Sequence, residues 1–325
     1  MQSIQADVKL LDAEVFVPYI LDAFKNAKRH KAPRQLADLT KNARLAEAVQ
    51  RLSRWSLSTP TGMPEGYDAT DVKGKRLPPT QAQIDDSVAA TIYAVWRSEF
   101  IADTIDAQLT GLPVLEGSSA LVALRNLLDN FATNHGVGAS GVNFFPVPGL
   151  SAPEDARDVV ILSSLAGALD ALAGDAFDAA FHKSATLADY RWGKLHRVVF
   201  EHPLGAPFSI PPAGGAFPPP LAGLPGIPVD GGYQTVDAAS HDVRAASVND
   251  FMFPAGPVRR FVSEPSWREP YSESIWPGGT SGVLGSPWYF NFLPLWLTND
   301  AIPLLLDHKD VQRHEAEVIK FVPAR

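Results

Sequence analysis

The chain has 325 residues, of which 46% are hydrophobic, and a mean hydropathy of −0.03, values typical of folded globular proteins rather than disordered or membrane-spanning ones. Its net charge of −8 arises from 36 acidic against 28 basic residues with no basic cluster, which argues against nucleic acid as a partner. The lack of cysteine excludes disulfides and thiolate metal sites, and fits a cytoplasmic or a periplasmic protein.

Neither the apolar runs nor the first residues of the chain suggest a membrane or export segment. The longest apolar run, 290–306, is interrupted by prolines and polar residues, so no membrane span is predicted. The residues that open the chain carry neither a basic n-region nor an apolar h-region, so no export signal is expected in it.

The first 180 residues have the pattern of a mainly helical region. A helix predicted over 12–28 contains Pro18, which should kink it because proline removes a backbone donor and clashes with the preceding turn. Apolar residues at three- and four-residue spacing predict a second helix over 34–55. A polar loop with glycine and proline is expected over 56–79.

Three more helices follow, and two of them begin with the sequence of a capping box, in which two side chains satisfy free N–H groups of the first turn. The first box, 80–83 (TQAQ), precedes an apolar stripe that extends to residue 100. The other box, 151–154 (SAPE), precedes a stripe that extends to residue 172. Between them, the leucines of 121–131 predict a helix that ends at His135-Gly136.

Near residue 180 the pattern changes to short strands and loops. Nine prolines within 203–228 fix so many φ angles and remove so many donors that a long irregular loop is predicted there. A short helix is expected at 310–317. Strands are predicted at 197–201, 234–238, 249–253, 258–263 and 318–322. Helices first and strands later indicate the α+β class.

The most specific motif lies near the end of the chain, where 276–289 reads WPGGTSGVLGSPWY and is followed by Leu293-Pro294-Leu295-Trp296. It resembles the PGGxSGxxxSPxY…LW element that closes the β chain of the penicillin acylase family, whose members are N-terminal-nucleophile amidohydrolases. Four further segments are similar to elements of that β chain: 1–8, 192–205 (WGKLHRVVFEHPLG), 231–237 (GGYQTVD) and 256–262 (GPVRRFV). Two departures are Trp288, where many relatives carry His, and Asn291-Phe292, which replaces an acidic-rich stretch.

The resemblance implies catalysis by a serine at the first residue of a processed β chain, with its own α-amino group as the base. This chain begins Met1-Gln2, so the nucleophile is expected to lie outside it. Internal processing is not favoured at Ser118, which lies in a helix start, at Ser140, which lacks a following Asn, or at Ser286, which precedes proline. No catalytic residue is therefore predicted in this chain, and its substrate-binding residues are left unassigned.

The other groups that could carry chemistry have structural interpretations. Around Ser281 the second glycine comes one place too early for a nucleophile elbow, so a glycine-rich turn is favoured. His196 and His202 would lie roughly 20 Å apart along a strand, too far to share an ion. His308 and His314 would lie nearly opposite each other on a helix. By resemblance His202 ends a strand near the family's cleft, where hydrogen bonding is expected of it rather than catalysis.

A pair of arginines and a group of aromatic residues also stand out in the second half of the chain. Arg259 and Arg260 would point to opposite faces of a strand, and one of them is expected to pair with a buried carboxylate. Eight aromatic residues could either line an acyl pocket or form a core, and their density favours a core. They are Trp267, Tyr271, Trp276, Trp288, Tyr289, Phe290, Phe292 and Trp296. Because the calcium ligands of relatives lie upstream of Met1, no metal and no cofactor are predicted.

Taken together, the sequence predicts one α+β, acylase-like domain with a mainly helical part, 1–180, and a strand and loop part, 181–325, that contains the proline-rich loop 203–228. The resemblance implies the C-terminal portion of an αββα sandwich, expected to be incomplete and inactive alone. Its function would be hydrolysis of a linear amide by a serine outside this chain. The alternatives are a non-catalytic binding module and one chain of a split acylase.

The resemblance also sets the expected partners. They are the remainder of the acylase, meaning the nucleophile-bearing segment and the α chain, and a small amide substrate of the complete enzyme. Neither nucleic acid nor a membrane is expected. The complete parent enzyme would be periplasmic by resemblance, whereas the location of this chain and the identity of the amide are left open.

Overall fold

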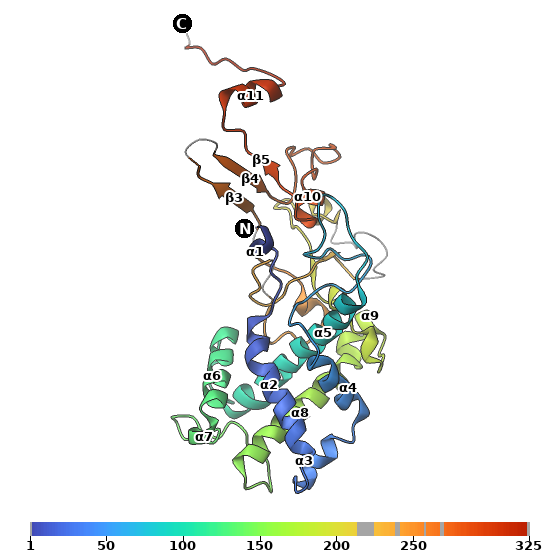
Figure 1. Cartoon of the computed structure of the whole chain (residues 1–325), viewed down its shortest axis with the longest axis vertical. Helices are drawn as coiled ribbons and strands as arrows, with labels where there is room; N and C mark the ends of the chain where they lie inside the picture. Colours follow the sequence, from blue (N-terminus) through green and yellow to red (C-terminus); the bar gives the residue numbers. More distant parts are fainter. Residues whose placement is uncertain (1, 213–223, 238–240, 257, 267–269, 324–325) are drawn as a thin grey trace.

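A computed structural model describes residues 2–212, 224–237, 241–256, 258–266 and 270–323. Helices fill the first half of the chain and short strands the second, so the α+β class is confirmed. The molecule is elongated, with the longer helices gathered at one end, and a small sheet and the last helix at the other (Figure 1).

Four helices form the body of the helical half: α2 (Leu11–Ala27), α4 (Ala43–Leu52), α5 (Gln81–Ile101) and α8 (Pro153–Leu172). Helix α5 packs against α8 and α4, and α8 also packs against α2. Because α5 is covered by neighbours on nearly all sides, its second half is buried regardless of helical face. The indole of Trp96 on α5 donates a 3.1 Å hydrogen bond to the Ile161 carbonyl of α8, which joins the two central helices through a fully buried polar contact.

Of the two predicted capping boxes, the structure contains one. Thr80 and Gln83 form the predicted capping box of α5, with the Thr80 N–H donating to the Gln83 side chain at 2.8 Å. The box predicted at 151–154 does not form: Pro153 takes the first helical position, so Ala152 is the N-cap and Ser151 lies one residue too early.

The helix predicted over 34–55 is two helices, α3 (Arg34–Leu39) and α4. Asn42 separates them, because its side chain accepts a hydrogen bond of 3.2 Å from the Leu45 N–H and starts α4 there. Helix α2 runs through Pro18 without a break.

The remaining helices of this half, apart from α6, are short. The first residues form α1 (Gln2–Gln5), and a π-helical turn, Ala102–Asp106, extends α5. Helices α6 (Gly117–Asp129) and α7 (Phe131–Asn134) end where predicted, since His135 and Gly136 both adopt left-handed φ angles. Helix α9 (Asp178–Phe181) ends the helical region.

The second half contains two small antiparallel sheets. Strand β1 (Arg197–Val198) pairs with β2 (Ile227–Pro228). Strand β3 (Arg260–Glu264) pairs with β4 (Tyr271–Ile275), and β4 pairs with β5 (Ile302–Pro303). Helix α10 (Leu293–Leu297) packs beneath the second sheet, and α11 (His308–His314) follows it.

Several predicted strands are wrong. Gln234 has a φ of 56°, so 234–237 forms a turn, and Ala238 lies outside the described residues. A 3₁₀ turn, Val248–Phe251, replaces the strand at 249–253, and 318–322 has no strand partner in the described residues. The strand at 197–201 is shortened to β1.

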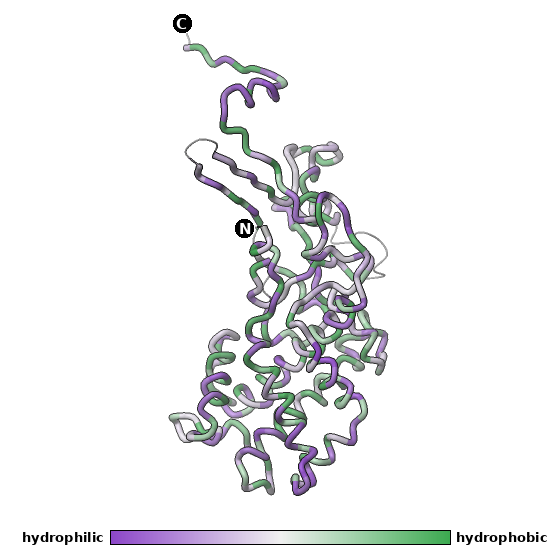
Figure 2. Tube along the Cα trace, viewed as in Figure 1, coloured by the Kyte–Doolittle hydropathy of each residue, from purple (hydrophilic) through white to green (hydrophobic). Residues whose placement is uncertain are grey.

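Two hydrophobic cores hold this arrangement together. The larger one fills the helical half and also takes in side chains from the second half, among them Trp192, Leu224 and Phe251. The smaller one joins β1, β2, β4 and α10 through Val198, Ile227, Val229, Phe253, Ile275, Leu293, Trp296 and Leu297. Hydrophobic segments also continue beyond α11 into the C-terminal tail, which stands away from the body (Figure 2).

No single helix in the described ranges is long and apolar enough to cross a membrane. A bent pair, Pro153–Leu172 with Asp175–Phe181, meets the length and composition test only jointly.

Candidate functional site

The segments singled out in the sequence meet around one arginine, Arg260 on β3. Its Nη2 donates to Asp237 Oδ1 at 2.5 Å, and its Nη1 donates to the Trp296 carbonyl at 2.6 Å and to Asn299 Oδ1 at 2.5 Å. Its guanidinium also lies over the Trp296 ring, 4.5 Å from the centroid. These four residues are called the Arg260 hub below, and they confirm the expected pairing of one of the two arginines with a buried carboxylate.

The hub connects three of the family-like segments, and two further hydrogen bonds attach the other two. The Asp237 N–H donates to the Asp7 carbonyl at 2.9 Å, which ties in the start of the chain. The indole of Trp192 donates to the Gly231 carbonyl at 2.7 Å. The five segments are therefore one contiguous structure, although up to 288 residues separate their ends in the sequence.

Three further aspartates lie beside the hub and are held by backbone donors. Asp68 accepts hydrogen bonds from the Thr61 N–H at 2.5 Å and from the Thr61 hydroxyl at 2.7 Å. Asp71 accepts from the Asp68 N–H at 2.9 Å, and Asp230 accepts from the Ala69 N–H. With Asp237, this acidic group has four carboxyls, and Arg260 is paired with one of them.

Burial dominates the electrostatics of this acidic group. It raises the pKa of Asp68 to about 6 and raises the pKa of Asp230 well above its ordinary value, where Asp237 and Asp68 add to the effect. Burial also raises the pKa of Asp237, although Arg260 opposes the shift. These buried carboxyls therefore keep their protons to a higher pH than exposed aspartates do.

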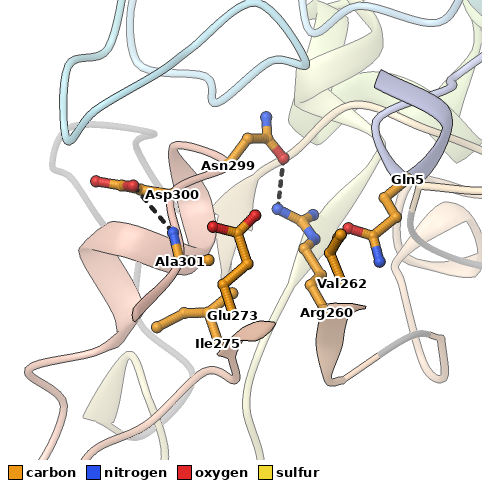
Figure 3. A pocket seen from close by; sticks show the side chains of 8 residues that line it. All are labelled: Gln5, Arg260, Val262, Glu273, Ile275, Asn299, Asp300 and Ala301. Atoms are coloured by element: carbon orange, nitrogen blue, oxygen red, sulfur yellow. Dashed lines mark hydrogen bonds between the residues drawn. The ribbon is translucent and has the colours of Figure 1, made fainter. Parts of the chain in front are cut away.

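The cavities at the hub are small. One of about 10 Å³ lies between Asp68, Asp230, Asp237 and Arg260. Another of about 20 Å³ lies on the opposite side, where Arg260 points toward Asn299 with Glu273 and Gln5 on either side (Figure 3). Volumes of this size hold a water molecule or two rather than an amide substrate, so the hub is a structural junction in the described chain.

The serines considered in the sequence lie apart from the hub and from one another. Ser118 is half-buried at the start of α6, and Ser140 is exposed in a turn. The hydroxyls of Ser281 and Ser286 accept backbone hydrogen bonds within the glycine-rich turn, from Val283 and Trp288 respectively. In the described residues none of the four is hydrogen-bonded to a histidine or a carboxylate.

Two of the histidines, His196 and His241, are buried next to each other, which the sequence did not indicate. His196 is fully buried and stacks on Trp192 with ring centroids 5.3 Å apart. Its Nδ1 lies 2.9 Å from the Phe251 carbonyl, while its Nε2 has no hydrogen-bond partner among the described residues. His241, also buried, faces it with ring centroids 6.0 Å apart. His202 accepts a hydrogen bond from the Leu204 N–H, the structural role expected of it. Within the described ranges no group of three or more His, Asp or Glu side chains is placed to hold a metal ion.

The late aromatic residues form a core only in part. Trp296 is buried in the smaller core and Phe292 packs against it, as predicted. Tyr271, Trp276, Trp288 and Phe290 are instead at least 39% exposed, so the core interpretation is wrong for them. Trp267 lies outside the described residues.

These features define an α+β protein whose motif segments converge on a buried arginine–aspartate pair. The penicillin amidase family matches residues 1–313, and the chain belongs to that family. No curated protein sequence shows significant similarity to it. Family membership confirms the resemblance seen in the sequence and identifies an acylase-like amidohydrolase domain.

Proposed function

We propose that this chain is the C-terminal segment of an acylase-like amidohydrolase, in which a serine outside the chain hydrolyses a linear amide. The observation that carries the proposal is the convergence of the five family-like segments on the Arg260 hub, within a match to the penicillin amidase family. None of the four serines discussed above has a base within hydrogen-bond reach among the described residues, which agrees with a nucleophile supplied from elsewhere.

The partner in this proposal is the remainder of the acylase, and the second sheet offers a surface for it. Strand β3 is an edge strand, paired with β4 on one side only among the described residues. The Gln5 side chain caps one acceptor of its outer edge, the Phe261 carbonyl, at 3.0 Å. Phe261 itself is 44% exposed. An exposed strand edge with apolar side chains is a surface that a further strand can cover.

The test is complementation. The purified chain is assayed on phenylacetyl, glutaryl and long-chain acyl amides, alone and with a polypeptide that carries the α chain and the nucleophile-bearing start of the β chain of a family member. Turnover is expected only in the mixture. Phe261→Asp should lower the mixed activity at least tenfold, whereas the matched control Leu112→Asp, on an exposed residue of the helical half, should leave it unchanged.

Two outcomes would contradict the proposal. Turnover by the chain alone that is lost on changing Ser118, Ser140 or Ser286 to Ala would show an internal nucleophile. Saturable binding of an amide without turnover in any mixture would favour the non-catalytic binding module instead.

A further inference from the structure

An apolar cavity of about 350 Å³ lies beside α10 and shares Tyr67 and Leu297 with the wall of the small cavity at Arg260. Three segments distant in the sequence enclose it: Tyr67 from the loop after α4, residues 209–212, and the stretch from the glycine-rich turn to α10. Most of its wall is hydrocarbon, supplied by Ile210, Pro211, Leu284, Phe290, Leu293 and Leu297. None of the lining residues in the described part of the chain is charged.

The polar groups at the wall are few, and most are already engaged. The Tyr289 hydroxyl donates to the Phe208 carbonyl at 2.6 Å. The Ser209 hydroxyl accepts from the His202 N–H at 3.2 Å and donates to the Gly205 carbonyl at 3.4 Å. The Tyr67 hydroxyl, by contrast, makes no hydrogen bond to the described residues. Among the described residues, it is the one hydroxyl of the lining side chains without a hydrogen-bond partner, and we take it as the donor to a ligand.

We propose that this cavity is a binding site for an uncharged, mainly apolar small molecule with one hydrogen-bond acceptor for the Tyr67 hydroxyl. An apolar cavity of roughly 150 Å³ accepts benzene, and ligand pockets start at roughly 300 Å³. The volume of about 350 Å³ therefore suits a bicyclic aromatic or a branched alkyl group. A charged ligand is disfavoured, because it would lose its hydration against a wall that offers no opposite charge.

The proposal rests on binding alone and does not depend on the proposed amide hydrolysis. The site needs no nucleophile, and its occupant is bound rather than converted. Its test therefore measures binding to the chain alone, so failure of the complementation experiment and failure of this proposal are distinguishable.

Three naphthalene probes separate the contributions: 2-acetylnaphthalene, which carries an acceptor, 2-ethylnaphthalene, which has the same shape without one, and 2-naphthoate, which is charged. Titration calorimetry on the full chain should show both neutral probes binding and the anion at least a hundredfold weaker. Tyr67→Phe should weaken the ketone about five- to tenfold, the value of one hydrogen bond, and leave the hydrocarbon within twofold.

Two tryptophan substitutions, one in the cavity wall and one at the adjacent residue outside it, test where the probes bind. Leu284 lines the cavity and is half exposed, so Leu284→Trp can fill the space without disturbing the core, and both neutral probes should be lost. Val283 is adjacent, 68% exposed and outside the lining, so Val283→Trp should bind normally. Far-ultraviolet circular dichroism checks that each variant is folded. Three outcomes would overturn the proposal: Leu284→Trp binding the neutral probes as well as the parent chain does, the anion binding as well as the neutral probes, or neither neutral probe binding. The last outcome would leave the cavity as a contact surface for another polypeptide.

Discussion

Arg260 and Asp237 form an ion pair of 2.5 Å in which the aspartate side chain is only 2% exposed and the arginine side chain 12%. The pair joins strand β3 to the turn that contains Gly232 and Thr235. The same guanidinium also holds the Trp296 carbonyl at the end of α10. One side chain thus fixes the relative positions of a strand, a turn and a helix.

Removing this arginine should destabilise the fold strongly. Arg260→Gln leaves the Asp237 carboxyl buried without its cation, and breaking a buried pair in this way costs about 3–5 kcal/mol of unfolding free energy. Arg259 is the matched control: it is exposed and donates to Ser274, so Arg259→Gln should cost less than about 1 kcal/mol. Urea unfolding followed by tryptophan fluorescence measures both. If the two variants lose similar amounts of unfolding free energy, the buried ion pair of Arg260 does not stabilise the fold as predicted.

The acidic group should make stability fall as the pH rises. The pKa of Asp68 is near 3.8 in the unfolded chain and about 6 when folded, so between these values the folded state holds a proton that the unfolded state has released. The stability present below pH 3.8 is thus lost as the pH passes 6, by about 3 kcal/mol. Asp68→Asn, which does not titrate, should remove this loss, so the variant should gain on the parent between pH 4 and pH 8.

Asp22→Asn, an exposed change on α2, is the control and should not alter the pH profile. The measurement is urea unfolding at half-unit steps of pH. Parallel profiles for the Asp68 variant and the parent would show that the carboxyl is ionised in the folded chain at acidic pH.

His196 should have the opposite effect. Burial lowers its pKa to about 4, with a smaller contribution from Arg197, against 6.5 in the unfolded chain. Between pH 6.5 and 4 the unfolded state binds a proton that the folded state does not, so acidification through this window should cost about 3 kcal/mol. His196→Phe keeps an aromatic ring against Trp192 and should remove this loss.

His241 faces His196, and burial, Arg97 and His196 lower its pKa in the same direction, so part of the acid sensitivity should persist in the variant. The exposed His30→Phe serves as the control. An acid limb that is unchanged in His196→Phe would assign the whole effect to His241 and contradict the prediction.

The sequence predicted those features whose determinants are local. Thr80 and Gln83 are three residues apart and interact directly, so their motif is sufficient to start α5. The strand period places Arg259 and Arg260 on opposite faces, which made a buried pair foreseeable. Where two local signals compete, as with Ser151 and Pro153, the stricter backbone requirement of proline decides the start of the helix.

The acidic group could not be predicted because its burial is made by residues far apart in sequence. Asp68 lies in a segment with the composition of a polar surface loop, and no pattern around it indicates a carboxyl with a raised pKa. The contact that encloses the group, between Ala69 and Asp230, spans 161 residues. The aromatic residues show the reverse case: their density predicts a core, yet Trp288 and Phe290 flank a glycine-rich turn that projects them outward.

The C-terminal tail, residues 304–323, contains no buried residue among those described. Val318, Ile319, Phe321 and Val322 are each at least 70% exposed, and the edge strand β3 lies at the same end of the molecule (Figure 1). Exposed apolar segments and open strand edges associate in water. We therefore expect the purified chain to self-associate and to bind a dye specific for apolar surface.

Replacing Ile319 and Phe321 together with Ser should reduce both the dye signal and the apparent mass in size-exclusion chromatography with light scattering. Leu112 and Val122 are also exposed, at 62% and 59%, but lie in the helical half, so the same change at those positions should have little effect. The helical half should keep its far-ultraviolet signal in every variant, because its core does not include the tail. A monomer with little dye binding and one cooperative unfolding transition would contradict the need for a partner and favour a self-sufficient binding module.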